Sequence, residues 1–420
     1  FRSKRLHPSA GRPRRAINTV TLSWRYLWSR PLASALNLLL LTLGLGSITF
    51  VLLASHQLER AFERDLAGID VVVGAKGSPL QLILAGVFHI DVPPGNIPLA
   101  EVKALAQHPQ VAQLIPLSLG DSFRGFRIVG TTANYLAHYQ AKLAQGAPWA
   151  APMQAGLGAQ VAAPPGLKIG DTFAGSHGLG GAGDAHGHTP YTVSGVLAPC
   201  ACVLDRLILT ATESVWKVHE DMHSGDTPLD REEQEALEAE REVTIALIRY
   251  RTPLAAVTFP RYVNSTTAMQ AAAPAVEITR LLGMVGVGTR VLQGFGVVLL
   301  LTAGLSVFIA LWSAVRERRA DLAMLRMLGA PPARVGALLL CEALWLALLA
   351  SALGLMGAHG LTAVAGWLLQ GEKSLAVDAW QWVPIEAWVP VGAVAVAGLA
   401  AALPAWAAYR VDVARLLNAR

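Results

Sequence analysis

Residues 291–315 read VLQGFGVVLLLTAGLSVFIALWSAV and contain no charged side chain. At about 1.5 Å per residue, a helix of this length covers the roughly 30 Å of hydrocarbon in a bilayer. Three further runs are also long and apolar: SALNLLLLTLGLGSITFVLLA at 34–54, the segment 335–369, which is interrupted by Glu342 and His359, and AWVPVGAVAVAGLAAALPAWAAY at 387–409. Four such runs in one chain argue against buried helices of a soluble core, so the sequence predicts four transmembrane helices.

The composition agrees with a membrane protein. Only 15% of the 420 residues are charged and 53% are hydrophobic, with a mean hydropathy of +0.43. A soluble protein carries about 25% charged residues. Because the deficit is concentrated in the four runs, it indicates spanning segments rather than a uniformly apolar chain.

The basic residues predict the orientation of these helices. Residues 1–33 carry eight Lys or Arg side chains, the last of them Arg30, and no acidic side chain. The 316–334 loop and the tail after residue 409 are also basic, whereas the 370–386 loop is mildly acidic. The positive-inside rule therefore puts both termini and the 316–334 loop in the cytoplasm and residues 55–290 outside. The net charge of +5 is then an orientation signal, and it does not favour binding to nucleic acid, because the basic residues lie beside the membrane.

The domain organisation follows from these runs. We expect the first run to remain as an uncleaved anchor, since no small-residue cleavage site accompanies it. The predicted segments are a basic segment with an interfacial helix at 1–33, spans at 34–54, 291–315, 335–369 and 387–409, an outside domain with helical stalks at 55–290, a cytoplasmic loop at 316–334, a short outside loop at 370–386, and a tail at 410–420.

The outside domain reads as a mixture of helices and strands. Period-2 patterns predict strands, and SPLQLILAG at 78–86, with Ser78 as N-cap, predicts a short helix. The strand candidates are 69–77, 111–132, 168–175, 189–198, 205–211 and 243–251. The fold class is therefore a four-helix membrane protein with an inserted α+β domain, large enough to bury its own core.

The loop after the second span is predicted to be a docking element. Leu322, Leu325 and Leu328 recur at helical spacing among basic residues, and Gly329 followed by two prolines can end the helix. Such a helix can dock in a groove of a partner. The alternative is a plain basic loop that obeys the positive-inside rule.

The same loop resembles a known family signature. The segment 317–330, ERRADLAMLRMLGA, is similar to the coupling helix of the FtsX-like permeases, which include MacB-type exporters and lipoprotein-release subunits. The segment 403–420, LPAWAAYRVDVARLLNAR, is similar to the C-terminal motif of the same family, except that Val413 stands where proline is usual. Blocks at 110–136, 156–173 and 191–199 resemble the MacB-type periplasmic domain. The resemblance implies that the loop touches an ATPase through Glu317, Arg318, Arg319, Asp321, Leu322, Leu325, Arg326, Leu328, Gly329 and Ala330.

The ATPase itself is expected on a separate chain. No G-x-x-x-x-G-K-[ST] occurs in the sequence, so the chain contains no P-loop for ATP. No G-x-S-x-G or H-E-x-x-H occurs either, and nothing in the sequence indicates a hydrolase. We therefore expect a non-catalytic membrane subunit.

The resemblance implies a specific mode of action. Two copies would pair in a bacterial inner membrane, and each would hold one ABC ATPase. Closure of the ATPases on ATP would rearrange the periplasmic domains through the stalks. A periplasmic binding protein or adaptor would be a further partner. Two alternatives stay open: a metal-handling transporter, and a non-transporting regulator of a periplasmic partner. Stimulation of ATP hydrolysis by a substrate, or only by a protein, separates transport from regulation.

Two ionisable residues interrupt the third run. Glu342 lies inside it, where an ionisable residue is a functional hypothesis by default. The alternative is a structural acid near the cytoplasmic interface, bonded to a neighbour or to the coupling region. His359 lies near the outer end and is expected to be an interface residue.

The outside domain contains a group of candidate zinc ligands. Imidazole and thiolate groups suit zinc or copper, although their spacing matches no firm zinc motif. The alternatives are a solvated loop and cysteines that are buried or oxidised, with pairing between the two neighbouring cysteines disfavoured. The candidates are His177, His186, His188, Cys200, Cys202, His219 and His223.

Overall fold

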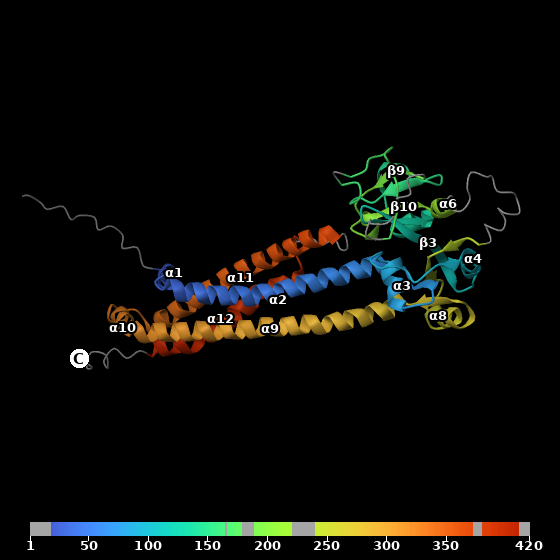
Figure 1. The fold of residues 1–420 in the computed structure, drawn as a ribbon. Coiled ribbons are helices and arrows are strands. Elements are labelled where there is room, and N and C mark those ends of the chain that lie inside the picture. Colours follow the sequence, from blue (N-terminus) through green and yellow to red (C-terminus); the bar gives the residue numbers. More distant parts are fainter. Residues whose placement is uncertain (1–17, 164–165, 179–188, 221–239, 373–379, 411–420) are drawn as a thin grey trace, which may run out of the picture. The chain divides into compact units, whose positions relative to one another are not determined.

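A computed structural model describes residues 18–163, 166–178, 189–220, 240–372 and 380–410. Within these ranges the chain forms two compact units. The membrane unit takes the described parts of 1–55, 288–365 and 378–420, and the sheet unit takes those of 56–287 and 366–377. Figure 1 shows the elements of both units in chain order.

The membrane unit confirms the four predicted apolar helices. They are α2 (Pro31–Leu66), α9 (Pro274–Glu317), α11 (Pro332–Glu372) and α12 (Trp388–Tyr409), the last preceded by the short helix η2 (Pro384–Ala387). Helix α2 has 36 residues, about 54 Å at the usual helical rise, so it is longer than the roughly 30 Å that hydrocarbon requires. The predicted stalks are the ends of α2 and α9, which continue the spanning helices without a break.

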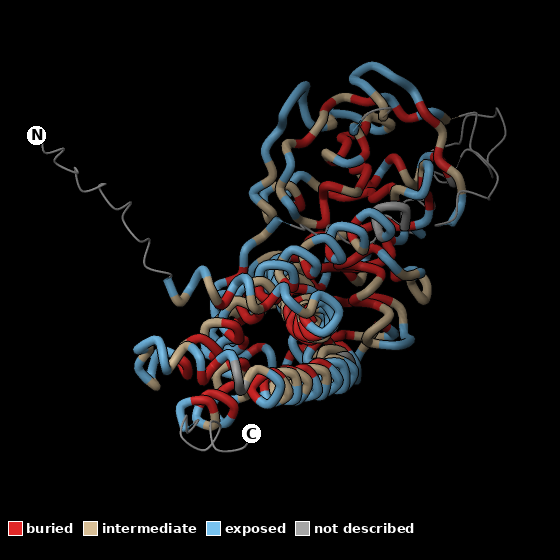
Figure 2. Tube along the Cα trace, turned by 90° about the vertical axis from the view of Figure 1, so that its left-hand side faces the viewer, coloured by how far each residue is buried: buried red, intermediate tan, exposed pale blue. Residues whose placement is uncertain are grey.

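The spanning helices each have an inner and an outer face. Ala303, Val307 and Leu311 of α9 lie in a buried cluster with residues of α2, α11 and α12, whereas Leu301 and Leu305 are exposed. Figure 2 shows this mixture of buried and exposed positions along the helices. Because the exposed positions are apolar, they suit contact with lipid rather than water.

A short helix, α1 (Thr19–Leu27), precedes the first span, as the sequence predicts for the interfacial segment. Asn18 is its N-cap and accepts a hydrogen bond from the Val20 N–H. Trp24 packs edge-on against Trp345 of α11, with ring centroids 5.0 Å apart. Helix α1 is therefore attached to the spanning helices through its aromatic side chains.

The sheet unit is built on one long, mostly antiparallel sheet. The strand order is β13–β1–β12–β3–β4–β10–β6–β9–β5, with β7 beside β9, β8 beside β3, and a separate β2–β11 pair. The strands are β1 (Val71–Ala75), β2 (Ile97–Pro98), β3 (Val111–Phe123), β4 (Phe126–Thr131), β5 (Leu143–Gly146), β6 (Gln154–Leu157), β7 (Thr172–Phe173), β8 (Ser176–His177), β9 (Tyr191–Leu197), β10 (Leu207–Ala211), β11 (Glu242–Val243), β12 (Ile245–Tyr250) and β13 (Met269–Ala272).

Both faces of the sheet centre are covered. Val71 and Val73 of β1 point into one core cluster and Val72 points into the other, as the alternation of side chains along a strand requires. The covering helices are α3 (Pro79–Gly86), α4 (Leu99–Ala106), α5 (Ala133–His138), α6 (Thr212–Glu220) and α8 (Ala255–Thr266), with a short helix η1 (Val203–Arg206) before β10. The uninterrupted valine run of β1 is therefore a consequence of its two buried faces.

The sequence missed some of these elements and overstated one. Helices α6 and α8 and strand β13 were not predicted, and the strand expected at 168–175 is reduced to β7. The start of that segment forms a turn instead, in which the Asp171 carboxylate accepts a hydrogen bond from the Lys168 N–H at 2.8 Å. The acidic stretch predicted as an insertion at 221–242 lies almost entirely outside the described residues.

Candidate functional site

The predicted cytoplasmic docking element is a short helix, α10 (Arg319–Met327). Gly329 follows it with φ +93°, and the Ala330 N–H donates to the Leu325 carbonyl at 3.0 Å. This left-handed glycine closes the helix in the usual C-terminal geometry. Helix α11 starts at Pro332, so the expected stop signals are confirmed.

The two faces of α10 have different surroundings. Leu322 and Leu325 pack into the core of the membrane unit, whereas Leu328 is 85% exposed. Met324 and Met327 are also exposed, at 54% and 55%. Of the three leucines in the predicted docking set, Leu322 is therefore buried in the chain itself, Leu325 is half-buried and Leu328 faces outward. Helical spacing alone could not distinguish the leucines that pack on the membrane unit from the exposed Leu328. Met324 and Met327 were also not included in the docking set predicted from the sequence.

Glu317 and Arg318 hold the start of α10 in place. Arg318 is the N-cap residue, and its guanidinium donates hydrogen bonds to the Tyr26 carbonyl at 3.3 Å and to Ser29 Oγ, with the Tyr26 ring 4.5 Å below it. Glu317 forms an ion pair with Arg30. These two residues of the predicted docking set therefore bond within the chain, to the turn between α1 and α2.

The remaining polar residues of the set are near the ends of α10. Asp321 is exposed in the first turn, where a negative charge favours the helix dipole. Arg326 is half-buried in the last turn. Arg319 begins the helix, but its side chain lies outside the described set, and Ala330 is half-buried after Gly329.

The intramembrane acid Glu342 is connected to the same place. It is 4% exposed on α11, and its carboxylate lies 3.5 Å from Arg318. A cavity of about 300 Å³ lies beside it, lined by Tyr26, Ser34, Asn37 and Ser306 among others. The geometry agrees with a structural acid bonded to the coupling region, which was one of the two interpretations of the sequence.

A second buried pair lies at the other end of α11. His359 Nε2 is 2.9 Å from the Glu386 carboxylate, and the Trp382 ring stacks on the imidazole with centroids 6.3 Å apart. Glu386 is fully buried and also accepts the Val383 N–H. The sequence predicted His359 to be an interface residue near one end of the span, and it did not reveal this partner.

The candidate metal ligands are only partly described. His177 lies at the end of β8, and its Nδ1 is 3.1 Å from the buried carboxylate of Asp121 on β3. The backbone of His219 lies in α6, whereas His186, His188 and His223 lie outside the described residues. Among the described residues no group of three or more His, Cys, Asp or Glu side chains could hold a metal ion.

The two outside cysteines are bonded to each other. Cys200 and Cys202 form a disulfide with a Cα–Cα distance of 5.1 Å, which is the pairing that the sequence disfavoured. A left-handed Ala201, with φ +53°, turns the chain so tightly that the two side chains meet. In this oxidised form neither sulfur is a thiolate, which is the form that binds metals.

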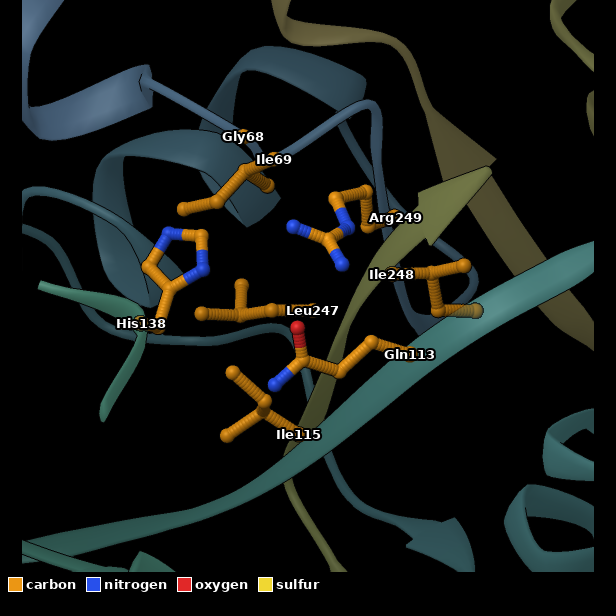
Figure 3. A pocket seen from close by; sticks show the side chains of 8 residues that line it. All are labelled: Gly68, Ile69, Gln113, Ile115, His138, Leu247, Ile248 and Arg249. Carbon is orange, nitrogen blue, oxygen red and sulfur yellow. The ribbon is translucent and has the colours of Figure 1, made fainter. Parts of the chain in front are cut away.

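The disulfide lies against the end of helix α2. The Asp65 carboxylate accepts a hydrogen bond from the Val203 N–H at 3.0 Å, and the Asp65 carbonyl accepts one from the Tyr139 hydroxyl at 2.8 Å. Just beyond, Gly68 adopts φ +79° beneath the His138 ring, beside a cavity of about 10 Å³ that Figure 3 shows between His138 and Arg249. A space of this size holds about one water.

Comparisons with known proteins match both parts of the chain. Residues 34–204 match the family model of the MacB-like periplasmic core domain, and residues 294–413 match that of the FtsX-like permease C-terminal region. A stretch of 102 residues is 28% identical to the pyoverdine export ATP-binding/permease protein PvdT of Pseudomonas fluorescens (strain Pf0-1). That stretch is 24% of this chain and only 14% of PvdT.

Two solved structures are similar to part of the chain. The periplasmic region of MacB from Actinobacillus actinomycetemcomitans matches with a TM-score of 0.34 and 11% identity, over 51% of this chain and 95% of that one. The extracellular domain of the noncanonic ABC-type transporter YknZ from Gram-positive bacteria matches with a TM-score of 0.30 and 10% identity, over 48% and 98%. With both family models matched in the expected order along four apolar helices, the chain belongs to the FtsX/MacB-type family of ABC transporter permeases.

Proposed function

We propose that this chain is the membrane subunit that couples ATP hydrolysis on a separate cytoplasmic ATPase to rearrangement of its own periplasmic domain. Two copies would act together, each holding one ATPase through α10. The positive-inside pattern supports a cytoplasmic location for α10 and both termini. The chain's own part in this cycle is mechanical and non-catalytic.

The exposed apolar face of α10 is the observation that carries the proposal. Met324, Met327 and Leu328 are exposed, while Leu322 on the inner face is buried in the membrane unit. Flexible methionine side chains suit a contact surface that must adapt to a partner. Because Arg318 also ties the start of α10 to Glu342 and to Tyr26, a force applied to the outer face reaches the spanning helices.

The test is co-purification with the cognate ABC ATPase after co-expression. Met324→Asp and Leu328→Asp place a charge on the outer face of α10 and are expected to reduce the amount of bound ATPase at least tenfold. Leu254→Asp, at an equally exposed leucine of the sheet unit, is the matched control and is expected to leave binding unchanged. Full co-purification of both α10 variants would reject docking through this face.

Zinc handling is a second candidate, which the pair of His177 and Asp121 favours. A carboxylate on Nδ1 is the arrangement that orients many zinc-binding histidines. His186 and His188 follow His177 in the sequence and lie outside the described residues.

Equilibrium dialysis of the full chain with Zn²⁺ tests this candidate. We expect binding in the micromolar range that falls at least tenfold in His177→Ala, with His108→Ala, a histidine distant in sequence, as the control. Binding weaker than millimolar, or binding unchanged after loss of His177, His186 and His188 together, would exclude a zinc site in this loop.

A further inference from the structure

The loop that closes the Cys200–Cys202 disulfide is a small, exposed ring. It connects β9 to η1, and only Ala201 separates the two cysteines. Pro199 and Ala201 are exposed, and each cysteine is half-buried against the core of the sheet unit. A thiol in solution can therefore approach the sulfurs without opening the core.

The two sulfurs have different electrostatic surroundings. Asp205 Oδ1 lies 3.3 Å from Cys200 Sγ and also accepts the Cys200 N–H at 2.9 Å. Cys202 instead lines a cavity of about 20 Å³ together with Arg64, Arg206 and the buried Asp65. The Asp205 carboxylate disfavours a thiolate at Cys200, where the Cys202 N–H at 3.2 Å is the opposing contact. Beside Cys202, two guanidinium groups against the one carboxylate of Asp65 leave a net positive charge, which favours a thiolate there.

This asymmetry selects one direction of exchange. In thiol–disulfide exchange the sulfur whose thiolate is better stabilised is the better leaving group. Attack on Cys200 Sγ, with release of Cys202 as the thiolate, is therefore the favoured first step. The cavity beside Cys202 provides space for the water that would solvate the released sulfur.

We propose that the Cys200–Cys202 disulfide is a thiol–disulfide exchange site for an external dithiol, and that its reduction releases the loop from the end of helix α2. One thiolate of the dithiol attacks Cys200 Sγ, breaking the S–S bond and forming a mixed disulfide, and Cys202 takes up a proton. The second thiolate of the dithiol then attacks its own bridging sulfur and releases Cys200, which is protonated. The protein gains two electrons and two protons, and the dithiol becomes a disulfide.

The consequence for the stalk follows from the residue after Cys202. The Val203 N–H donates to the buried Asp65 carboxylate of α2. The ring restrains Ala201 in its left-handed conformation, which only a few per cent of non-glycine residues adopt. Opening the ring frees Ala201 to leave that conformation, which shifts Val203 away from Asp65. The inference goes beyond the proposed function and does not depend on docking of an ATPase.

The experiment uses the full chain in detergent with dithiothreitol as the dithiol. After alkylation under native conditions, mass spectrometry counts the modified cysteines, with Cys341 as an internal reference for a cysteine within a spanning helix. We expect Cys200 and Cys202 to be alkylated while the circular dichroism is unchanged. Hydrogen exchange of the peptide covering 200–206 is expected to rise at least tenfold and to return on reoxidation.

Variants of the arginine beside Cys202 test the direction of exchange. Arg64→Gln is expected to slow reduction several-fold, whereas Arg60→Gln, one helical turn earlier and also exposed, is expected to have no effect. The double variant Cys200→Ser/Cys202→Ser should show fast hydrogen exchange of the peptide 200–206 even without dithiothreitol. Alkylation only after denaturation would overturn the exchange site, and native reduction with unchanged hydrogen exchange would overturn the release of the loop.

Discussion

His89 is the buried histidine of the sheet unit on which acid sensitivity is expected to depend. Its Nε2 is 3.0 Å from the Tyr135 hydroxyl, and only 6% of the residue is exposed. Burial lowers the pKa of His89 well below its ordinary value, and the positive charges of Arg127 and Arg206 lower it further. The imidazole is therefore neutral in the folded protein at pH values where an unfolded chain would protonate it.

The sign of the pH effect follows from this depressed pKa. Below pH of about 6.5 the unfolded state binds a proton that the folded state does not, so folding stability falls as the pH falls. At pH 5.5 the free energy of unfolding is lower by about 1.4 kcal/mol, which corresponds to a decrease of roughly 3 °C in the midpoint of thermal unfolding. His89→Asn should remove this part of the acid sensitivity, because asparagine tolerates the left-handed backbone at φ +53° and does not titrate.

Thermal unfolding of both proteins at pH 7.5 and 5.5 measures the effect. His108→Asn, at a half-buried histidine elsewhere in the sheet unit, is the control and should keep the wild-type difference between the two pH values. An equal loss of stability in wild type and His89→Asn would show that His89 is not responsible.

At the scale of the element, the approach of α2 to α11 depends on two glycines. A Cβ built on Gly354 would lie 3.2 Å from the Gly46 nitrogen, and one built on Gly46 would lie 3.3 Å from the Gly354 carbonyl oxygen. Small residues let helix backbones approach closely in a membrane, where packing and hydrogen bonds drive association. The Gly46–Gly354 contact is therefore a point at which side-chain volume determines the helix separation.

Gly354→Leu is expected to push the two helices apart and to destabilise the membrane unit by about 1–3 kcal/mol, the usual cost of overpacking. Gly357→Leu, one turn further along α11, is the matched control, because a Cβ there meets no atom within 4 Å. The melting temperature of each variant in detergent gives the comparison. Similar melting temperatures for the two variants would mean that this contact is not a close-packed one.

At the scale of the whole molecule, three helices are divided between the two units. The chain passes from one unit to the other within α2, after Ser55, within α9, after Val287, and within α11, after Ala365. None of these passages contains a loop, since α2 continues to Leu66, α9 starts at Pro274 and α11 continues to Glu372. This continuity of the helices supports the proposed coupling of ATP hydrolysis to rearrangement of the inserted domain.

Much of this architecture was predictable because its signals are local. An apolar run long enough to cross a bilayer, such as 291–315, has few alternatives, and a valine run such as 71–73 between turn residues favours a strand. The stop of α10 at Gly329 was predictable for the same reason, since Gly-Ala-Pro-Pro carries its own backbone preferences. Helix α6 was missed because its pattern, TESVWKVHE, is short and mostly polar.

The sequence by itself determined the four spanning segments, the mixed character of the inserted domain and the family. Only the tertiary structure decided which side chains meet: Arg318 with Glu342, His359 with Glu386, Cys200 with Cys202, and Met324 rather than Leu322 on the outer face of α10. The physical reason is that backbone preference and hydropathy act over a few residues, whereas partners and exposed faces depend on how distant segments pack.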